Sequence, residues 1–197
     1  FIARQINFNG FYYELSLRGG QNRIDSSSND FMDSAGRPQY SAYNAKARVF
    51  NGHIRIGKQL NLNKRNLLDV YAFYFYTHQG SFGADLTTGE HYNFEKSNVS
   101  RFRIGYRLTT QISKVSRLYT GLAYQYDKNS GIGATYVKST ESLNIPATGE
   151  SGSSGMLELG WQIKPNKHVP WLVDLSTTGF VGHHKGLTAK LKFEKEF

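Results

Sequence analysis

Apolar and polar residues alternate along most of this chain, and the pattern is clearest at its C-terminal end. Between Gly186 and Phe197, apolar side chains occupy one parity, whereas threonine, lysine and glutamate occupy most of the other. Because successive side chains of a β-strand point to opposite faces, this alternation predicts a strand with one apolar face and one charged face.

Seven other segments show a related pattern, and together they predict an all-β chain of about eight antiparallel strands. The expected strands cover residues 10–20, 42–60, 67–79, 97–112, 117–128, 154–164, 171–181 and 186–197. The segment 42–60 changes phase near Asn51-Gly52. A β-bulge explains such a change, and an additional hairpin also explains it; we favour the bulge.

The connections between the expected strands alternate in length. The short polar connections are residues 61–66, 113–116 and 164–170. The long connections, rich in Ser, Gly, Asn, Asp and Thr, are residues 21–41, 80–96 and 129–153, and a brief one follows at 182–186. Short turns at one end and long loops at the other are typical of outer-membrane barrels, whose apolar faces contact lipid. The sequence therefore predicts a transmembrane antiparallel up-and-down β-barrel, formed by residues 1–197 as one domain.

The polar faces of these strands carry many charges, which the barrel interpretation directs into the interior. The predicted lumen-facing charges are Arg18, Arg48, Arg101, Arg103, Arg107, Glu158, Asp174, Lys190 and Lys192. Charged residues face the interior of barrels in general, so we favour the interpretation that they form a solvated wall rather than a specific site. The alternative is that the inward arginines hold an acidic or helical segment in place. The inward glycines Gly105, Gly121 and Gly160 reduce the bulk of the wall, which suits an interior that houses a polypeptide segment.

Large aromatic residues gather near both ends of the expected strands. Trp161 and Trp171 lie near the short turns, and Tyr124 and Tyr126 lie near the long loops. Amphipathic rings at two levels are typical of the aromatic girdle at the membrane–water interfaces.

Composition narrows the function classes. The chain has no cysteine, so disulfides and thiolate metal sites are excluded. Its mean hydropathy is −0.52, and no apolar run reaches the ~18 residues of a membrane-spanning helix. The formal charge is +9, but the basic residues are dispersed and no nucleic-acid-binding motif is present, so we expect no nucleic-acid partner.

The histidines are the main candidates for chemistry. His183 and His184 are adjacent, which points their side chains apart in an extended turn, and His78 and His91 flank a segment that contains Asp85. None of these spacings indicates an acid, a base and a nucleophile acting together. We therefore expect no catalytic residue, no metal, no cofactor and no enzymatic activity.

Several sequence blocks, taken in order, resemble the translocator domain of autotransporters, the type V secretion family, from about Gly10 to Phe197. The blocks are Gly52 with Gly57-Lys-Gln-Leu60, Leu67-Leu-Asp-Val-Tyr71, Ser100-Arg-Phe-Arg-Ile-Gly-Tyr-Arg107, Tyr119-Thr-Gly-Leu-Ala-Tyr124, Glu158-Leu-Gly160, Thr178-Gly-Phe-Val-Gly-His-His-Lys-Gly186 and the terminal Phe197. The family's barrel has twelve strands and is threaded by a helix that leads to an N-terminal passenger. The resemblance implies that this chain supplies the last eight strands, about the C-terminal two-thirds; a self-contained eight-stranded barrel is the other architecture.

The resemblance also implies a function, a location and partners. It implies a translocator or anchor barrel in the outer membrane of a Gram-negative bacterium that exports or displays a passenger absent from this chain. The implied partners are outer-membrane lipid, the barrel-assembly machinery, and the passenger or a linker helix in the lumen. A stand-alone small outer-membrane barrel, acting as a surface or structural protein or as a channel, is the alternative. The first residues lack a start methionine and the order of a signal peptide, which indicates a processed product or a fragment.

The last expected strand resembles the C-terminal signal that the barrel-assembly machinery recognises. Its residues are the terminal Phe197 with Phe193, Leu191, Ala189 and Leu187. The segment departs from the family pattern at Lys195, where an aromatic or apolar residue is usual. A lysine near the interface can extend its amine into the headgroups, so the departure weakens the match without removing it.

Overall fold

The computed structural model describes residues 2–6, 9–32, 35–164 and 170–195, and every regular element in these ranges is a β-strand. The strands are β1 (Ile2–Ile6), β2 (Phe11–Met32), β3 (Pro38–Asn61), β4 (Asn66–Gln79), β5 (Phe82–Asp85), β6 (His91–Phe94), β7 (Ser97–Gln111), β8 (Ser116–Asn129), β9 (Ala134–Lys138), β10 (Glu141–Ile145), β11 (Glu150–Ile163), β12 (Trp171–Gly182) and β13 (Gly186–Lys195). No helix in these ranges is long and apolar enough to cross a membrane.

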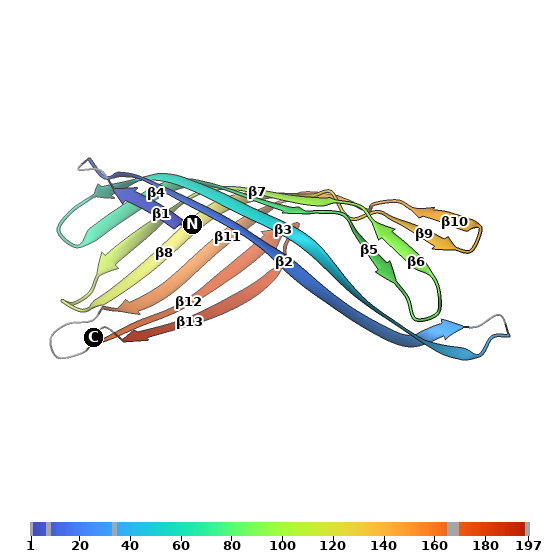
Figure 1. Cartoon of the computed structure of the whole chain (residues 1–197). Helices are drawn as coiled ribbons and strands as arrows, with labels where there is room; N and C mark the ends of the chain where they lie inside the picture. The colour runs from blue at the N-terminus through green and yellow to red at the C-terminus, as the bar shows by residue number, and fades with distance from the viewer. Residues whose placement is uncertain (1, 7–8, 33–34, 165–169, 196–197) are drawn as a thin grey trace.

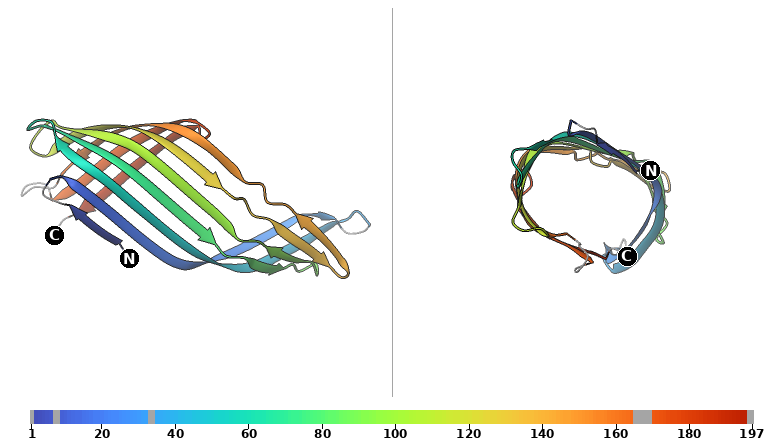
Figure 2. Two further views of the ribbon diagram at one scale, coloured as in Figure 1. Left: turned by 90° about the horizontal axis from the view of Figure 1, so that it is seen from above. Right: turned by 90° about the vertical axis from the view of Figure 1, so that its left-hand side faces the viewer.

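Nine strands form one antiparallel sheet in the order β1-β2-β3-β4-β7-β8-β11-β12-β13. The sheet curls around an axis into most of a ring, and the ribbon is open where its two edge strands lie (Figure 2). The transmembrane up-and-down architecture predicted from the alternation is confirmed, but the sheet has nine strands rather than eight. The extra strand is β1, which pairs with β2 through Ile2↔Ser16 and Ile6↔Tyr12 and is too short to show alternation.

The predicted alternation places apolar side chains on the outer face of the curled sheet. On β7, Phe102, Ile104 and Tyr106 are 42–50% exposed, while the arginines of opposite parity point to the interior. Neighbouring strands keep the same parity, as in the pair Phe102↔Tyr126. Large exposed apolar side chains in one continuous band suit a lipid environment.

A second sheet lies beyond one end of the first. Its four strands follow the order β10-β9-β6-β5, and it lies at the end opposite the short turns, near the long β2–β3 hairpin (Figure 1). The segments 21–41, 80–96 and 129–153, predicted to be loops, therefore contain strands. Their Ser-, Gly- and Asn-rich sequences lack apolar alternation, and cross-strand backbone hydrogen bonds form these strands instead.

The phase change near Asn51-Gly52 is neither the predicted bulge nor a hairpin. The ladder runs through this point without interruption, with Leu17↔Gly52 and Arg18↔Asn51, and the register of the β2–β3 pair shifts only between Ser28 and Phe31. The backbone register is constant, whereas the chemistry of the two faces changes where the hairpin leaves the apolar band.

Between Asn51 and the tip of the β2–β3 hairpin, the charged residues of β3 lie on the outer face and its small apolar residues lie on the inner face. Ala45 and Ala47 are buried together with Ala84, Leu86 and Ala134 of the second sheet and its turns. Backbone hydrogen bonds join the two parts, from Gly80 N to Arg48 O at 2.9 Å and from Thr87 N to Ala42 O at 3.0 Å. The outer part of the molecule thus has its own small apolar core.

Candidate functional site on the inner wall

Three arginines of β7 project into the interior of the curled sheet, into a hollow of about 460 Å³. Arg107 binds Glu158 of β11 through two parallel hydrogen bonds, Nε to Oε2 at 2.9 Å and Nη2 to Oε1 at 2.8 Å. The pair spans the intervening strand β8 at Gly121, which is the partner of Arg107 in one ladder and of Glu158 in the other. A Cβ at Gly121 would lie 3.2 Å from Glu158 Oε2, so glycine leaves room for the pair.

The other two arginines of β7 bind residues of β8. Arg101 Nε donates to Asp127 Oδ1 at 2.5 Å, and His184 Nε2 lies 3.1 Å from the other carboxylate oxygen. Arg103 donates through both Nε and Nη2 to Gln125 Oε1, at 3.1 and 2.6 Å. Gln125 Nε2 donates in turn to Asp127 Oδ2 at 2.6 Å. The three arginines of β7 are therefore paired with side chains of β8 and β11 rather than left as free charges.

A second cluster joins β2, β3 and β4 near the short turns. Asp69 accepts hydrogen bonds from Tyr12 Oη at 2.8 Å and from Arg55 Nη2 at 3.0 Å. The Arg55 guanidinium lies 4.2 Å from the ring centroid of Tyr71 and 5.5 Å from that of Tyr12. A Cβ at Gly57 would lie 2.6 Å from the Tyr12 ring, so glycine is needed beneath this tyrosine.

The same tyrosine–glycine arrangement occurs on the other side of the wall. Tyr119 of β8 crosses Gly160 of β11, where a Cβ would overlap the ring, and reaches β12. There, its hydroxyl donates to Asp174 Oδ1 at 2.6 Å. The space left by Gly160, interpreted from sequence as room for a polypeptide segment, is occupied by Tyr119.

The structure places most of the predicted interior charges on the inner face. Five of them make the inner-wall contacts described above: Arg101, Arg103, Arg107, Glu158 and Asp174. Strand parity places three others on the same face: Arg18, Lys190 and Lys192. Arg48 is different: it shares the parity of Phe50 and Ile54, which are exposed on the outer face, so the structure places it outside. Tyr12, Tyr119 and Gln125 also contribute to the inner wall; as uncharged residues they lie outside the predicted set of lumen-facing charges.

The predicted girdle residues lie on the outer face at two levels. Trp161 donates from Nε1 to Ser116 Oγ at 2.8 Å near the short turns, and Trp171 stacks on Phe193 with ring centroids 4.7 Å apart. At the other level, Tyr124 Oη lies 2.7 Å from Ser153 Oγ, and Tyr126 is 40% exposed. Trp161 and Tyr124 each combine an apolar body with a hydrogen-bonded polar group, as interfacial rings require.

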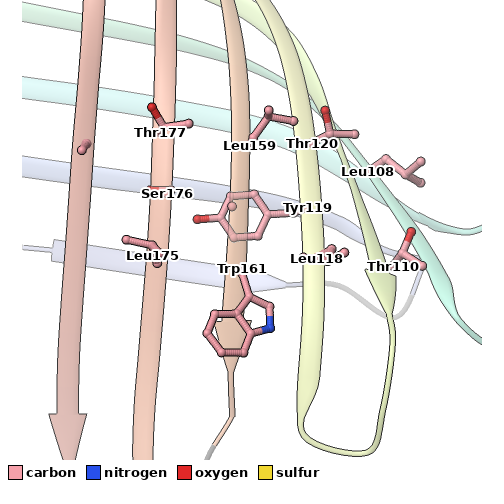
Figure 3. Close-up of a pocket in the computed structure, with 12 residues that line it drawn as sticks. Leu108, Thr110, Leu118, Tyr119, Thr120, Leu159, Trp161, Leu175, Ser176 and Thr177 are labelled. Carbon is pink, nitrogen blue, oxygen red and sulfur yellow. The ribbon is translucent and has the colours of Figure 1, made fainter.

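The outer face also contains a shallow hollow of about 610 Å³, shown in Figure 3. One row of paired residues crosses it, in which two leucines are each followed by a threonine and the row ends on an alanine: Leu108, Thr120, Leu159, Thr177 and Ala189. Trp161 closes the hollow on the side of the short turns. In β13, Leu187, Leu191 and Phe193 are 62–77% exposed on the parity of Ala189, and Phe197 lies outside the described residues.

The histidines were the candidates for chemistry, and the structure gives each a different neighbour. His183 and His184 lie with ring centroids 5.0 Å apart in a T-shaped arrangement. His78 Nδ1 lies 2.8 Å from Asn98 Oδ1. Within the ranges that the structure describes, no group of three His, Cys, Asp or Glu side chains could hold a metal ion.

His91 in the second sheet is expected to make this sheet sensitive to pH. Its Nδ1 lies 2.5 Å from Asp85 Oδ1 and its Nε2 lies 3.0 Å from Asn93 Oδ1, and these hydrogen bonds raise the pKa of His91 above 6.5. These hydrogen bonds favour the protonated imidazole, so they stabilise the β5–β6 hairpin fully at pH values below the pKa of His91 in the unfolded chain. This stabilisation is lost as the pH rises through the pKa of His91 in the folded chain. Amide exchange in β5 and β6, corrected for intrinsic rates, should show protection falling over that window. A His91→Gln variant with the same pH dependence would contradict this.

A meandering antiparallel sheet, curled around a polar hydrogen-bonded interior and apolar on its outer face, is the wall of an outer-membrane-type β-barrel. The family model for the autotransporter beta-domain matches residues 2–176, so the chain belongs to the autotransporter β-domain family. This confirms the resemblance seen in the sequence blocks. The family consists of translocator and anchor domains of the Gram-negative outer membrane and is generally not enzymatic. No curated protein and no solved structure matches the chain.

Proposed function

We propose that this chain is the outer-membrane wall through which an N-terminal passenger polypeptide is exported or on which it is displayed. The observation that carries the proposal is the inner wall itself: the arginines of β7 are paired with side chains of other strands, while the outer face is apolar, in a chain of the autotransporter β-domain family. A wall of paired charges gives a polar path with few strongly attractive single sites. A polypeptide of varied sequence can pass along such a path without being held.

The free edges of the sheet bear on how the wall closes. Within the described residues, β1 and β13 each pair with one neighbour, and unpaired backbone groups are costly in hydrocarbon. We propose that the two edges are joined in the membrane, directly or through further strands of the twelve-stranded family barrel. Lipid acyl chains would cover the outer face, including the hollow beside Trp161.

The export step is tested with the complete reading frame that encodes this chain, expressed in a Gram-negative host. An epitope tag is placed in the segment that precedes the barrel, and intact cells are probed with antibody and with external protease. We expect the tag to be accessible on the cell surface, and to be retained in the periplasm when the strands β7–β13 are deleted. A tag that never reaches the surface, or a signal peptide placed directly before Phe1, would instead support the stand-alone barrel.

The barrel-assembly machinery is the second proposed partner, and Phe197 is the residue that tests it. Phe197→Asp is expected to reduce the assembled barrel in the outer membrane several-fold, because the terminal aromatic belongs to the apolar parity of the recognised strand. Assembly is measured by the heat-dependent shift on gels and by protease protection in outer-membrane fractions. The matched control is Glu196→Asp, on the opposite parity. Equal assembly of both variants and the parent would exclude the signal role of Phe197.

A further inference from the structure

The outer part of the molecule contains a hollow that the export function does not use. It has a volume of about 290 Å³ and lies between the long β2–β3 hairpin and the second sheet. Its walls include Ser26, Ser28 and Asp30 from β2, Tyr43 from β3, and Tyr92 and Phe94 from β6. The volume is near the lower end of the ~300–1,000 Å³ of small-molecule sites.

The aromatic rings in and behind this hollow form a platform rather than a box. Phe94 stacks on Phe82 with centroids 4.7 Å apart and an interplanar angle of 19°, and Tyr92 lies at 17° to Phe94. Tyr43 is also inclined to Phe94 by only 35°. Rings this close to parallel do not form the perpendicular walls that surround a cation. Tyr43, Tyr92 and Phe94 belong to the lining of the hollow, so a flat, partly apolar ligand placed there would meet aromatic surface.

The polar groups of the hollow are hydroxyls and one carboxylate. Ser28 Oγ donates to Asp30 Oδ2 at 3.0 Å and accepts from Asp30 N at 3.0 Å, which fixes the carboxylate at the edge of the hollow. Among the described residues that line it, none is a lysine, an arginine or a histidine. A phosphate or carboxylate ligand would therefore meet only negative charge, whereas a ligand rich in hydroxyl groups would find acceptors and donors.

The hollow lies well beyond the apolar band. β2 and β3 contain 22 and 24 residues, compared with 14 in β4, and a strand advances about 3.3 Å per residue. The extra length of the hairpin projects past the end opposite the short turns (Figure 1). In outer-membrane barrels this end faces the outside of the cell, where the ligands in reach are soluble molecules and surface polymers.

We propose that this hollow binds a neutral hexopyranose unit of an extracellular glycan. The apolar C–H face of the sugar ring stacks on Tyr92 and Phe94, and the sugar hydroxyls donate to Asp30 and exchange hydrogen bonds with Ser26. This activity is separate from passenger export and would persist if the export proposal failed.

The test uses the folded chain in a detergent that has no sugar headgroup, because an alkyl glycoside would occupy the site. The probes are the methyl glycosides of glucose, galactose, mannose and N-acetylglucosamine, and binding is followed by saturation-transfer NMR, with titration to obtain the dissociation constant. We expect at least one glycoside to bind, with the strongest saturation at the ring protons of one face. Asp30→Asn and Tyr92→Leu should each weaken that binding about tenfold or more.

The matched control is Tyr40→Ala, which removes a tyrosine that is 59% exposed on the same hairpin but outside the lining of the hollow. Its affinity for the glycoside should equal that of the parent chain, and all variants should keep the heat-dependent gel shift of the folded barrel. Binding of choline or lysine with no binding of any glycoside would overturn the proposal in favour of a cation site. The absence of all binding, or binding unchanged by Asp30→Asn and Tyr92→Leu, would also overturn it.

Discussion

Replacing Gly160 by valine is expected to destabilise the folded barrel by about 2–4 kcal/mol. The Tyr119 ring crosses β11 over the bare backbone of Gly160, and a side chain there would overlap the ring. The ring cannot move away without losing the hydrogen bond to Asp174 at 2.6 Å. Overpacking and the loss of a charge-assisted hydrogen bond therefore act together.

This loss is measured as the free energy of unfolding by urea titration of the barrel in lipid vesicles. Gly179→Val is the matched control, since Gly179 lies on the neighbouring strand facing outward, where the nearest atom to an added Cβ is Leu187 Cδ1 at 4.0 Å. The control should change stability by less than about 1 kcal/mol. Adding Tyr119→Ala to Gly160→Val should remove much of the clash, giving non-additive losses. Equal losses for the two valine variants would contradict the tyrosine–glycine account.

Asp69→Ala is expected to destabilise the barrel by about 2–3 kcal/mol. Asp69 accepts from both Tyr12 and Arg55, so its removal takes a charged acceptor away from a guanidinium and a tyrosine hydroxyl on the inner wall. The two side chains of the ion pair are 27% and 16% exposed, so residual hydration keeps the loss below that of a fully buried pair.

The same titration measures this prediction, with Asp25→Ala as the control. Asp25 pairs with Arg23 on the outer hairpin, where the side chains are 61% and 69% exposed, and an exposed pair contributes about 0–1 kcal/mol. A loss at Asp25 as large as that at Asp69 would show that the position of the pair in the wall is unimportant.

The membrane-spanning part of the fold was predictable because the alternation of apolar and polar residues can be recognised within each single strand. In β7 and β8 each residue's parity fixes its face, so Phe102 and Tyr126 can be assigned to one side without knowledge of their neighbours. Arg48 shows where this inference fails. The parity of β3 is constant, but beyond the apolar band charge faces outward; the phase change near Asn51-Gly52 marks this boundary, although from sequence it was interpreted as a bulge.

The tyrosine–glycine pairs could not be predicted from the sequence because they depend on register between distant segments. Tyr119 and Gly160 are opposite one another only because β8 and β11 pair at this point, although two other strands lie between them in the chain. An inward glycine opposite an inward tyrosine is a usable signal once the register is known. The second sheet was missed for a related reason, since its strands are held by cross-strand pairing rather than by apolar alternation.

The central claim is that the curled sheet crosses the membrane with its apolar face to lipid and its hydrogen-bonded face to water. The chain has no cysteine, so single cysteines can be placed at Arg101–Tyr106 in β7 and spin-labelled in reconstituted bilayers. Labels at Phe102, Ile104 and Tyr106 should be relaxed by oxygen, and labels at the intervening positions by a water-soluble nickel complex. A reversed alternation, or equal exposure of all six positions to the nickel complex, would contradict the account.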